Sequence, residues 1–239
     1  MYLGGLLFLS LLSCDVRVTQ DPFTLDVESS SVGRFNPKGQ KRALASSVQI
    51  AFLIEGQRIG GGSGNYFKHR GNTFILTAAH VAIAGEKYDL VIEEPIGVGQ
   101  HKAKIVYINH DSDVAIMKLE TELSTIKPIK WKRKDYWDVK TGEDLFYTGN
   151  PLGIQKLSLR GNVAKVYSDL ILMQGFAYDG ASGSAVFDRR GNVIGVVSAI
   201  PLDMIMGQIP QKIPSLVYVG ILSGIHNDEL HHLLEGSDE

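Results

Sequence analysis

The stretch YDGASGSAVFDRRGNVIGVV, residues 178–197, decides the fold class of this chain. Two short apolar runs, SAVF and VIGVV, flank the turn sequence DRRGN, and this pattern predicts a β-hairpin. Directly before the hairpin lies the glycine-rich bend GASGS, which carries Ser182 next to Gly183. Glycines permit such a bend because they adopt positive φ angles. The requirement for a tight turn explains the glycines but not the serine between them. A role for the serine becomes apparent only when residues elsewhere in the chain are considered.

The hairpin belongs to a series of short apolar segments that begins near residue 46. The segments are rich in β-branched residues and are separated by Gly, Asn and Asp clusters: SSVQIAFLIEG (46–56), NTFILTAAHVA (72–82), YDLVIEE (88–94), HKAKIVYINH (101–110), DVAIMKLE (113–120), EDLFYTGNP (143–151), QKLSLRGNVAKVYS (155–168) and SLVYVGILSG (215–224). Many short strands with almost no helical periodicity indicate an all-β barrel or sandwich.

The bulk composition is that of an ordinary globular protein, with 44% hydrophobic and 21% charged residues among 239. A chain of this length forms one large β domain or two small ones. The formal net charge of -2 argues against a nucleic-acid partner, because no excess of basic residues is present to displace counterions. The single cysteine, Cys14, excludes an internal disulfide, so core packing has to stabilise the fold.

The amino terminus reads MYLGGLLFLSLLSC, an apolar run too short to span a bilayer as a helix. It resembles the lipobox of bacterial lipoproteins, in which a signal peptide is cut before a cysteine that then carries lipid. We therefore expect a signal peptide over residues 1–13, lipidation of Cys14 and a polar linker over residues 14–45, with the protein exported to the bacterial cell envelope, on its periplasmic side or at the cell surface. The run lacks Lys and Arg, and a plain cleaved signal or a buried strand is the alternative interpretation.

The carboxyl terminus changes to a helical period in GIHNDELHHLLEG and predicts a short helix and tail over residues 225–239. His226, His231 and His232 lie close together in this segment, but no cysteine or acidic partner stands at a metal-ligand spacing. We expect a solvated helix face, no metal site and no cofactor.

Three segments together carry a chemical pattern. ILTAAHVA ends a strand at His80, HDSDVAIMKL begins one at Asp113, and DGASGSAVF presents Ser182. The order His, Asp, Ser resembles that of the chymotrypsin-like serine proteases. The resemblance covers about residues 46–224 and is closest to the bacterial Deg/HtrA-type peptidases, which share GSG before the histidine strand and GNPLG over residues 149–153.

The resemblance implies an all-β fold of two six-stranded antiparallel β-barrels, the first over about residues 46–125 and the second over about 140–224. Deg-type proteases usually add a PDZ domain, and we expect none here because only the predicted helix follows Gly224. Trypsins have an aspartate directly before the serine that receives a new amino terminus. Ala181 stands at that position, so the resemblance implies no zymogen cleavage of that kind.

The resemblance also implies catalytic roles. His80 would take the proton of the Ser182 hydroxyl as general base, and Asp113 would hold the imidazole in the right tautomer. The backbone N–H groups of Gly180 and Ser182 would form the oxyanion hole, and a side chain at position 180 would hinder the bend. Asp111 competes for the acid role, but the family pattern D-[VIL]-A-x-x-x-L fits Asp113.

The specificity pocket follows from the same resemblance. The family's pocket floor lies six residues before the serine, at Phe176, and its wall follows the strand after the hairpin, at Ser198, Ala199 and Ile200. These positions hold no carboxylate, and a branched Ile200 should narrow the entrance, so we expect cleavage after Ala, Val or Ile. Asp203 in the loop PLDMIMGQIPQKIP could turn inward and change this preference.

These features predict a serine endopeptidase that hydrolyses polypeptides through an acyl-enzyme intermediate. The sequence leaves the natural substrate and the oligomeric state open. One alternative is a catalytically inert, protease-like binding module of the cell envelope, and another is an esterase on the same fold. Labelling by a fluorophosphonate probe separates an activated serine from an inert site, and ester turnover without peptide cleavage would identify the esterase.

Overall fold

The computed structural model describes residues 36–94, 99–200, 202–205, 209–212 and 215–221. The predicted signal peptide, Cys14 and the predicted helix over residues 225–239 lie outside these ranges. Within them, no helix combines the length and the apolar character needed to cross a membrane.

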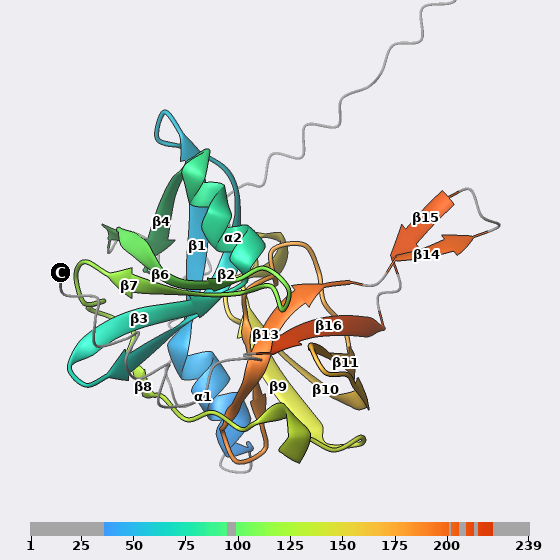
Figure 1. Cartoon of the computed structure of the whole chain (residues 1–239). Helices are drawn as coiled ribbons and strands as arrows, with labels where there is room; N and C mark the ends of the chain where they lie inside the picture. Colours follow the sequence, from blue (N-terminus) through green and yellow to red (C-terminus); the bar gives the residue numbers. More distant parts are fainter. Residues whose placement is uncertain (1–35, 95–98, 201, 206–208, 213–214, 222–239) are drawn as a thin grey trace, which may run out of the picture. The chain divides into compact units, whose positions relative to one another are not determined.

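The first half of the described chain forms a strongly curled sheet (Figure 1). Its strands are β1 (Ser47–Ile54), β2 (Gln57–His69), β3 (Asn72–Thr77), β4 (Asp89–Glu93), β5 (Gln100–His101), β6 (Ala103–Asn109), β7 (Val114–Leu119) and β8 (Ile129–Lys130). They pair in the order β5-β4-β1-β2-β3-β7-β6, and β8 pairs with β2. All these pairs are antiparallel except β2 with β8.

The second half forms a closed six-stranded barrel in the order β10-β11-β16-β13-β12-β9 (Figure 1). Its strands are β9 (Asp144–Gly149), β10 (Leu157–Val166), β11 (Leu170–Gln174), β12 (Ala185–Asp188), β13 (Val193–Ala199) and β16 (Leu216–Ile221). A separate hairpin, β14 (Leu202–Ile205) with β15 (Ile209–Lys212), lies between β13 and β16 in the chain. The predicted all-β double-barrel fold is confirmed, and the DRRGN turn joins β12 to β13 as expected.

The helical elements are short. They are α1 (Lys38–Ser46), α2 (Ala79–Ile83) and three single turns of 3₁₀-helix, η2 (Ala84–Glu86), η3 (Tyr136–Asp138) and η4 (Pro151–Gly153). Two of them matter for the site described below, because α2 begins just after β3 and η4 consists of the last three residues of the GNPLG motif.

Helix α1 corrects the sequence prediction, which assigned residues 14–45 to a polar linker. The helix lies beside β9 (Figure 1) and packs on β9 and β12 of the second barrel. Its Ala43 is fully buried. At Gly39 a Cβ atom would come within 2.0 Å of the carbonyl oxygen of Asp188, so only glycine permits this close approach. The helix was missed because it buries small residues and shows no stripe of large apolar ones.

The two halves share one buried apolar cluster. Phe67 stacks on Phe74 at 5.4 Å between ring centroids in the first sheet. The same cluster includes Phe187 and Val193 of the second barrel. A further cluster fills the second barrel around Tyr147, whose side chain is fully buried. Continuous packing between the halves fixes the border at which the candidate site lies.

A buried carboxylate stabilises the segment that leaves the first sheet. Glu94 is 6% exposed and accepts hydrogen bonds from the backbone N–H of Ser124 at 2.9 Å and of Thr125 at 2.6 Å. Its Oε1 also lies 2.9 Å from Nε2 of His101. Burial raises the pKa of Glu94, but the hydrogen bonds from Thr125 and Ser124 together outweigh it and bring the pKa to about 2.

We expect Glu94→Gln to lower the free energy of unfolding at pH 7 by about 3 kcal/mol, because the ionised carboxylate is bound in the folded state and free in the unfolded one. A depressed folded pKa gives stability that is present above the ordinary value of 4.5 and lost as the pH falls toward 2. Urea unfolding should therefore give a difference in the free energy of unfolding between wild type and Glu94→Gln that is smaller at pH 3 than at pH 7. Glu93→Gln is the control, because Glu93 pairs with the exposed Arg58 at 3.2 Å and such pairs contribute little to stability. Equal losses of unfolding free energy in the two variants would contradict the prediction.

Candidate active site

His80 lies where the first sheet ends in a helix. Strand β3 stops at Thr77, and α2 begins at Ala79 with Ala79, Val81 and Ala82 buried against the sheet. His80 is the second residue of this helix, and its side chain is 51% exposed. The buried neighbours anchor the helix, so the imidazole is held at the surface by a rigid element.

Asp113 reaches His80 because of the pairing of β3 with β7. Thr77 lies opposite Ala115 in this antiparallel pair, which brings the residue before β7 to the start of α2. Asp113 Oδ2 lies 2.7 Å from Nδ1 of His80, and Oδ1 accepts a hydrogen bond of 2.9 Å from the His80 backbone N–H. Asp111 is exposed in the preceding turn. Asp113 is therefore the carboxylate that the structure brings to His80.

Ser198 supplies a second partner for the same carboxylate. Its hydroxyl donates a hydrogen bond of 2.5 Å to Asp113 Oδ2. Burial raises the pKa of Asp113, but hydrogen bonds from the His80 ring, the Ser198 hydroxyl and the His80 backbone outweigh it and hold the pKa below its ordinary value. The sequence predicts Ser198 only as a pocket wall. Its contact with Asp113 was missed because it joins strands of the two different halves.

Ser182 lies on the bend before β12, half-buried. Its Oγ donates a hydrogen bond of 3.2 Å to the carbonyl oxygen of Ser198, and in the described part of the chain no hydrogen bond joins it to His80. The two side chains nevertheless line the same cavity. Catalytic hydrogen bonds are often formed only when substrate is bound.

The bend around Ser182 has the geometry of a tight turn. The Ala181 N–H donates to the carbonyl of Tyr178 at 2.9 Å, and Gly180, the third residue of this turn, has a φ of 93°. A positive φ at that position is the requirement of a type II turn. Among the described residues, neither the N–H of Gly180 nor that of Ser182 donates to an acceptor of the protein. Both donors are thus available to an external oxygen.

The cavity at these residues has a volume of about 330 Å³. Its lining comes from three places in the chain. These are His80 with Asp113; the serine bend with Ala177, Tyr178, Asp179 and Ser182; and the end of β13 with Val197, Ser198, Ala199 and the following Ile200. The predicted wall residues Ser198, Ala199 and Ile200 are all present. Tyr178 and Asp179 were not predicted, although their place beside the expected oxyanion glycine was a signal that could have found them.

Phe176 does not lie at the pocket floor, and that prediction is wrong. Its side chain is 53% exposed and does not line the cavity. The buried Tyr147 donates its hydroxyl hydrogen bond to the Phe176 carbonyl, which fixes the backbone here and leaves the ring in solvent. The next residue, Ala177, is buried and lines the cavity instead.

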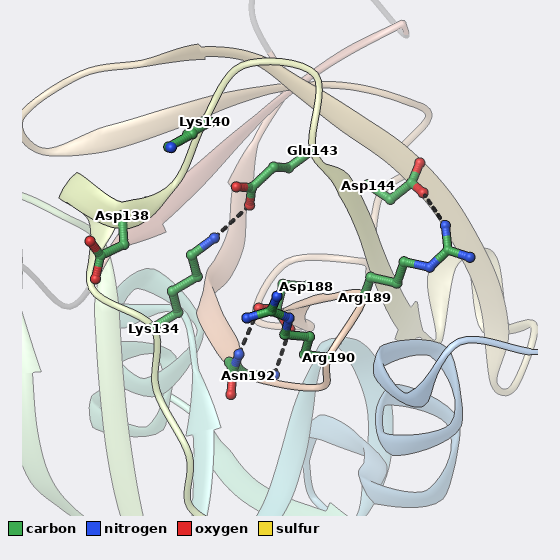
Figure 2. Close-up of a pocket in the computed structure, with 9 residues that line it drawn as sticks. All are labelled: Lys134, Asp138, Lys140, Glu143, Asp144, Asp188, Arg189, Arg190 and Asn192. Atoms are coloured by element: carbon green, nitrogen blue, oxygen red, sulfur yellow. Dashed lines mark hydrogen bonds and ion pairs between the residues drawn. The ribbon is translucent and has the colours of Figure 1, made fainter.

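A larger cavity of about 600 Å³ lies elsewhere, among charged residues of the second barrel and the segment before it (Figure 2). Its charges are largely satisfied by one another: Lys134 pairs with Glu143 at 2.6 Å, and Arg189 lies 3.5 Å from Asp144. Across the described ranges, no group of three His, Cys, Asp or Glu side chains could hold a metal ion. The smaller cavity brings His80, Asp113 and Ser182 together and is the better candidate for a reaction site.

Comparison with known proteins agrees with this geometry. Residues 62–196 match the family model of the trypsin-like peptidase domain. The serine protease HtrA-like of Staphylococcus epidermidis is 31% identical over 168 residues, which cover 60% of this chain and 27% of that protein. The serine protease HtrA-like of Staphylococcus aureus (strain USA300) is 31% identical over 160 residues, covering 58% of this chain and 20% of that protein. The chain thus matches about a quarter or less of the length of these curated relatives.

Solved structures show the same fold. The HtrA-type protease AlgW with tripeptide superimposes with a TM-score of 0.58 at 19% sequence identity, over 77% of this chain and 59% of that one. The matched family region begins at Gly62 in β2 and ends at Val196 in β13, so it includes His80, Asp113 and Ser182.

Proposed function

Because the chain belongs to the family of trypsin-like peptidase domains, we propose that it is a serine endopeptidase that hydrolyses polypeptides through an acyl-enzyme. His80, Asp113 and Ser182 are the proposed triad. The observation that carries the proposal is the pair of hydrogen bonds that the Asp113 carboxylate accepts from the ring and the backbone N–H of His80, at 2.7 Å and 2.9 Å, beside Ser182 in one cavity.

In the proposed reaction, the Ser182 oxygen attacks the carbonyl carbon of the scissile peptide bond, and His80 takes the hydroxyl proton. Asp113 remains ionised, holds the proton on Nδ1 and stabilises the imidazolium. The carbonyl oxygen becomes negative and accepts hydrogen bonds from the N–H groups of Gly180 and Ser182. His80 then gives its proton to the leaving amine as the peptide bond breaks. A water molecule next attacks the acyl-enzyme while His80 takes its proton, and the ester bond breaks as His80 returns that proton to the Ser182 oxygen.

The test is covalent labelling of the full chain by a fluorophosphonate probe, followed by digestion of an unfolded protein such as casein. An activated serine forms the covalent adduct, whereas the hydroxyl of a binding module does not react. Labelling together with new peptide ends supports the endopeptidase. Absence of labelling favours the inert binding module, and labelling with ester turnover but no peptide cleavage favours an esterase.

The cavity supports a preference for small or medium aliphatic side chains before the scissile bond. Its described lining includes the small residues Ala177 and Ala199 and the branched Ile200. Among the described residues of the lining, the one charge outside the proposed triad is that of Asp179, which is exposed and so lies in contact with solvent. An exposed carboxylate is screened and compensates only weakly for burying a basic side chain.

We expect a series of peptides that differ only in the residue before the scissile bond to be cleaved best after Ala, Val or Ile. The activation free energy should change by about 1–3 kcal/mol for each methylene-sized change in that residue. The measurement is kcat/KM for each member. Asp179→Asn is the matched variant. Preferred cleavage after Lys or Arg that disappears in Asp179→Asn would show that Asp179 sets a basic specificity, and preferred cleavage after Phe would show that Ile200 does not narrow the pocket.

A further inference from the structure

Ser63 in β2 lies directly beneath the serine bend and is fully buried. Its backbone N–H donates to the carbonyl of Ser182 at 2.8 Å. Its hydroxyl donates to the carbonyl of Gly180 at 2.7 Å and accepts a hydrogen bond of 2.9 Å from the Asn150 N–H. One side chain thus joins the first sheet, the bend that carries the proposed nucleophile and the GNPLG motif.

The GNPLG motif makes a second contact with the same bend. The N–H of Leu152 donates to the carbonyl of Asp179 at 2.9 Å. In a trans peptide the C=O and the N–H point in opposite directions. The contact therefore directs the Gly180 N–H, which belongs to the same peptide unit, away from Leu152. Leu152 adopts a φ of 53°, an unusual conformation for a branched residue, as it makes this bond.

The hydroxyl of Ser63 fixes the next peptide unit, between Gly180 and Ala181. Its hydrogen bond holds the carbonyl of Gly180 toward β2, while the Ala181 N–H at the other end of that unit bonds to Tyr178. Both peptide units on either side of Gly180 are thus held, one by Leu152 and one by Ser63. Rotation of the unit between Asp179 and Gly180 would turn the Gly180 N–H away from an oxygen bound at Ser182. Rotation of the unit between Gly180 and Ala181 would change the ψ angle of Gly180 and so move its N–H relative to that of Ser182.

The space around the Ser63 hydroxyl is closely filled. A Cβ atom at Gly149 would lie 3.1 Å from Ser63 Oγ and 2.3 Å from Ser184 Oγ. Removal of the hydroxyl therefore leaves the Gly180 carbonyl and the Asn150 N–H without their partner at a packed site, and an unpaired buried polar group is costly. The bend can regain a partner for Gly180 only by moving.

We propose that Ser63 is a positioning residue of the oxyanion hole, whose hydroxyl holds the Gly180 peptide in the orientation that the reaction requires. This inference rests on the proposed serine endopeptidase function. Ser63 does not touch the reacting atoms. It acts through Gly180, and its effect belongs to the step in which negative charge develops on the carbonyl oxygen.

The test compares Ser63→Ala with Thr77→Val. Thr77 is equally buried, and its hydroxyl donates to the Ser63 carbonyl at 2.8 Å without reaching the carbonyl of Gly180. Each variant loses one buried hydroxyl from the same neighbourhood. We expect kcat for an alanine or valine peptide p-nitroanilide to fall about 10- to 100-fold in Ser63→Ala with KM within twofold, since loss of an oxyanion-hole donor itself costs about 10²- to 10³-fold. Thr77→Val should lower the unfolding temperature while it keeps kcat within about threefold.

The rate of labelling by the fluorophosphonate probe gives the second readout, because the oxygen of its phosphoryl group occupies the same hole. This rate should fall by the same factor as kcat in Ser63→Ala and stay unchanged in Thr77→Val. If Ser63→Ala does not fold, Ser63→Cys replaces it, since a thiol is a weaker donor of similar shape, and an intermediate loss of kcat is expected.

The outcomes separate this inference from the proposed function. Wild-type kcat in Ser63→Ala or Ser63→Cys, or an equal loss of kcat in Thr77→Val, would overturn the positioning role while leaving the endopeptidase intact. Absence of labelling and cleavage in the wild-type chain would overturn the proposed function itself.

Discussion

Ser182→Ala should abolish both covalent labelling and peptide cleavage while leaving the fold intact. Loss of the nucleophile in an enzyme of this mechanism lowers kcat by about 10⁴- to 10⁶-fold, because the remaining groups can only bind and polarise the substrate. Ser182 is half-buried in the cavity, and its hydroxyl makes one hydrogen bond, to the Ser198 carbonyl. Its removal should therefore shift the unfolding temperature little.

Ser184→Ala is the matched control for this prediction. Ser184 stands two residues away, is fully buried and donates its hydroxyl hydrogen bond to the Ala181 carbonyl at 2.7 Å. A hydroxyl sealed in the core cannot attack a peptide, so this variant should still be labelled. If Ser182→Ala kept more than a few per cent of activity, or if labelling depended on Ser184 instead, the assignment of the nucleophile would be wrong.

Asp113→Asn should lower kcat by about 10⁴-fold, which is the second largest effect we expect. The amide oxygen of Asn can take the place of Oδ1 and accept the hydrogen bond of the His80 backbone N–H, which leaves the NH₂ group facing Nδ1. Because NH₂ is a donor, it favours the tautomer that carries its proton on Nε2 and cannot take a proton from Ser182. The shape of the side chain is kept, so the variant should fold. The readout is kcat with a peptide p-nitroanilide, combined with the unfolding temperature.

Asp111→Asn serves as the comparison, because Asp111 is two residues away and exposed. Its kcat should stay close to that of wild type. A reversal of the two results, with Asp111→Asn inactive and Asp113→Asn active, would reassign the acid. Equal small losses in both would argue that neither carboxylate orients the imidazole.

Local patterns in the sequence predict the β-strands and hairpins, whereas the double barrel and the pairing of His80 with Asp113 are predicted through the family resemblance. Strand alternation and turn residues decide the hairpins, and each of these two residues stands at the end of a readable strand. The choice between Asp111 and Asp113 also follows from a short motif. The meeting with Ser182 depends on the packing of the two halves, which the sequence pattern supplies only through the family resemblance.

The features that the sequence does not reveal depend on contacts between distant segments. The bond from Ser198 to Asp113 joins β13 to the start of β7, and that from Ser63 to Gly180 joins β2 to the serine bend. A serine that makes such a bond looks in the sequence like any other strand serine. Phe176 was misplaced for a related reason, since counting back from the serine does not reveal the contact of its carbonyl with the distant Tyr147 hydroxyl.

Helix α1 bears on the order in which the chain can fold. It comes first among the described elements, yet its partners are β9, which begins at Asp144, and β12, which ends at Asp188. A helix of nine residues is not stable by itself in water, and contacts so far apart in sequence close late because of the entropy of the intervening chain. During synthesis the segment Lys38–Ser46 therefore cannot complete its packing until β12 has been made, and we expect its docking to be a late event of folding.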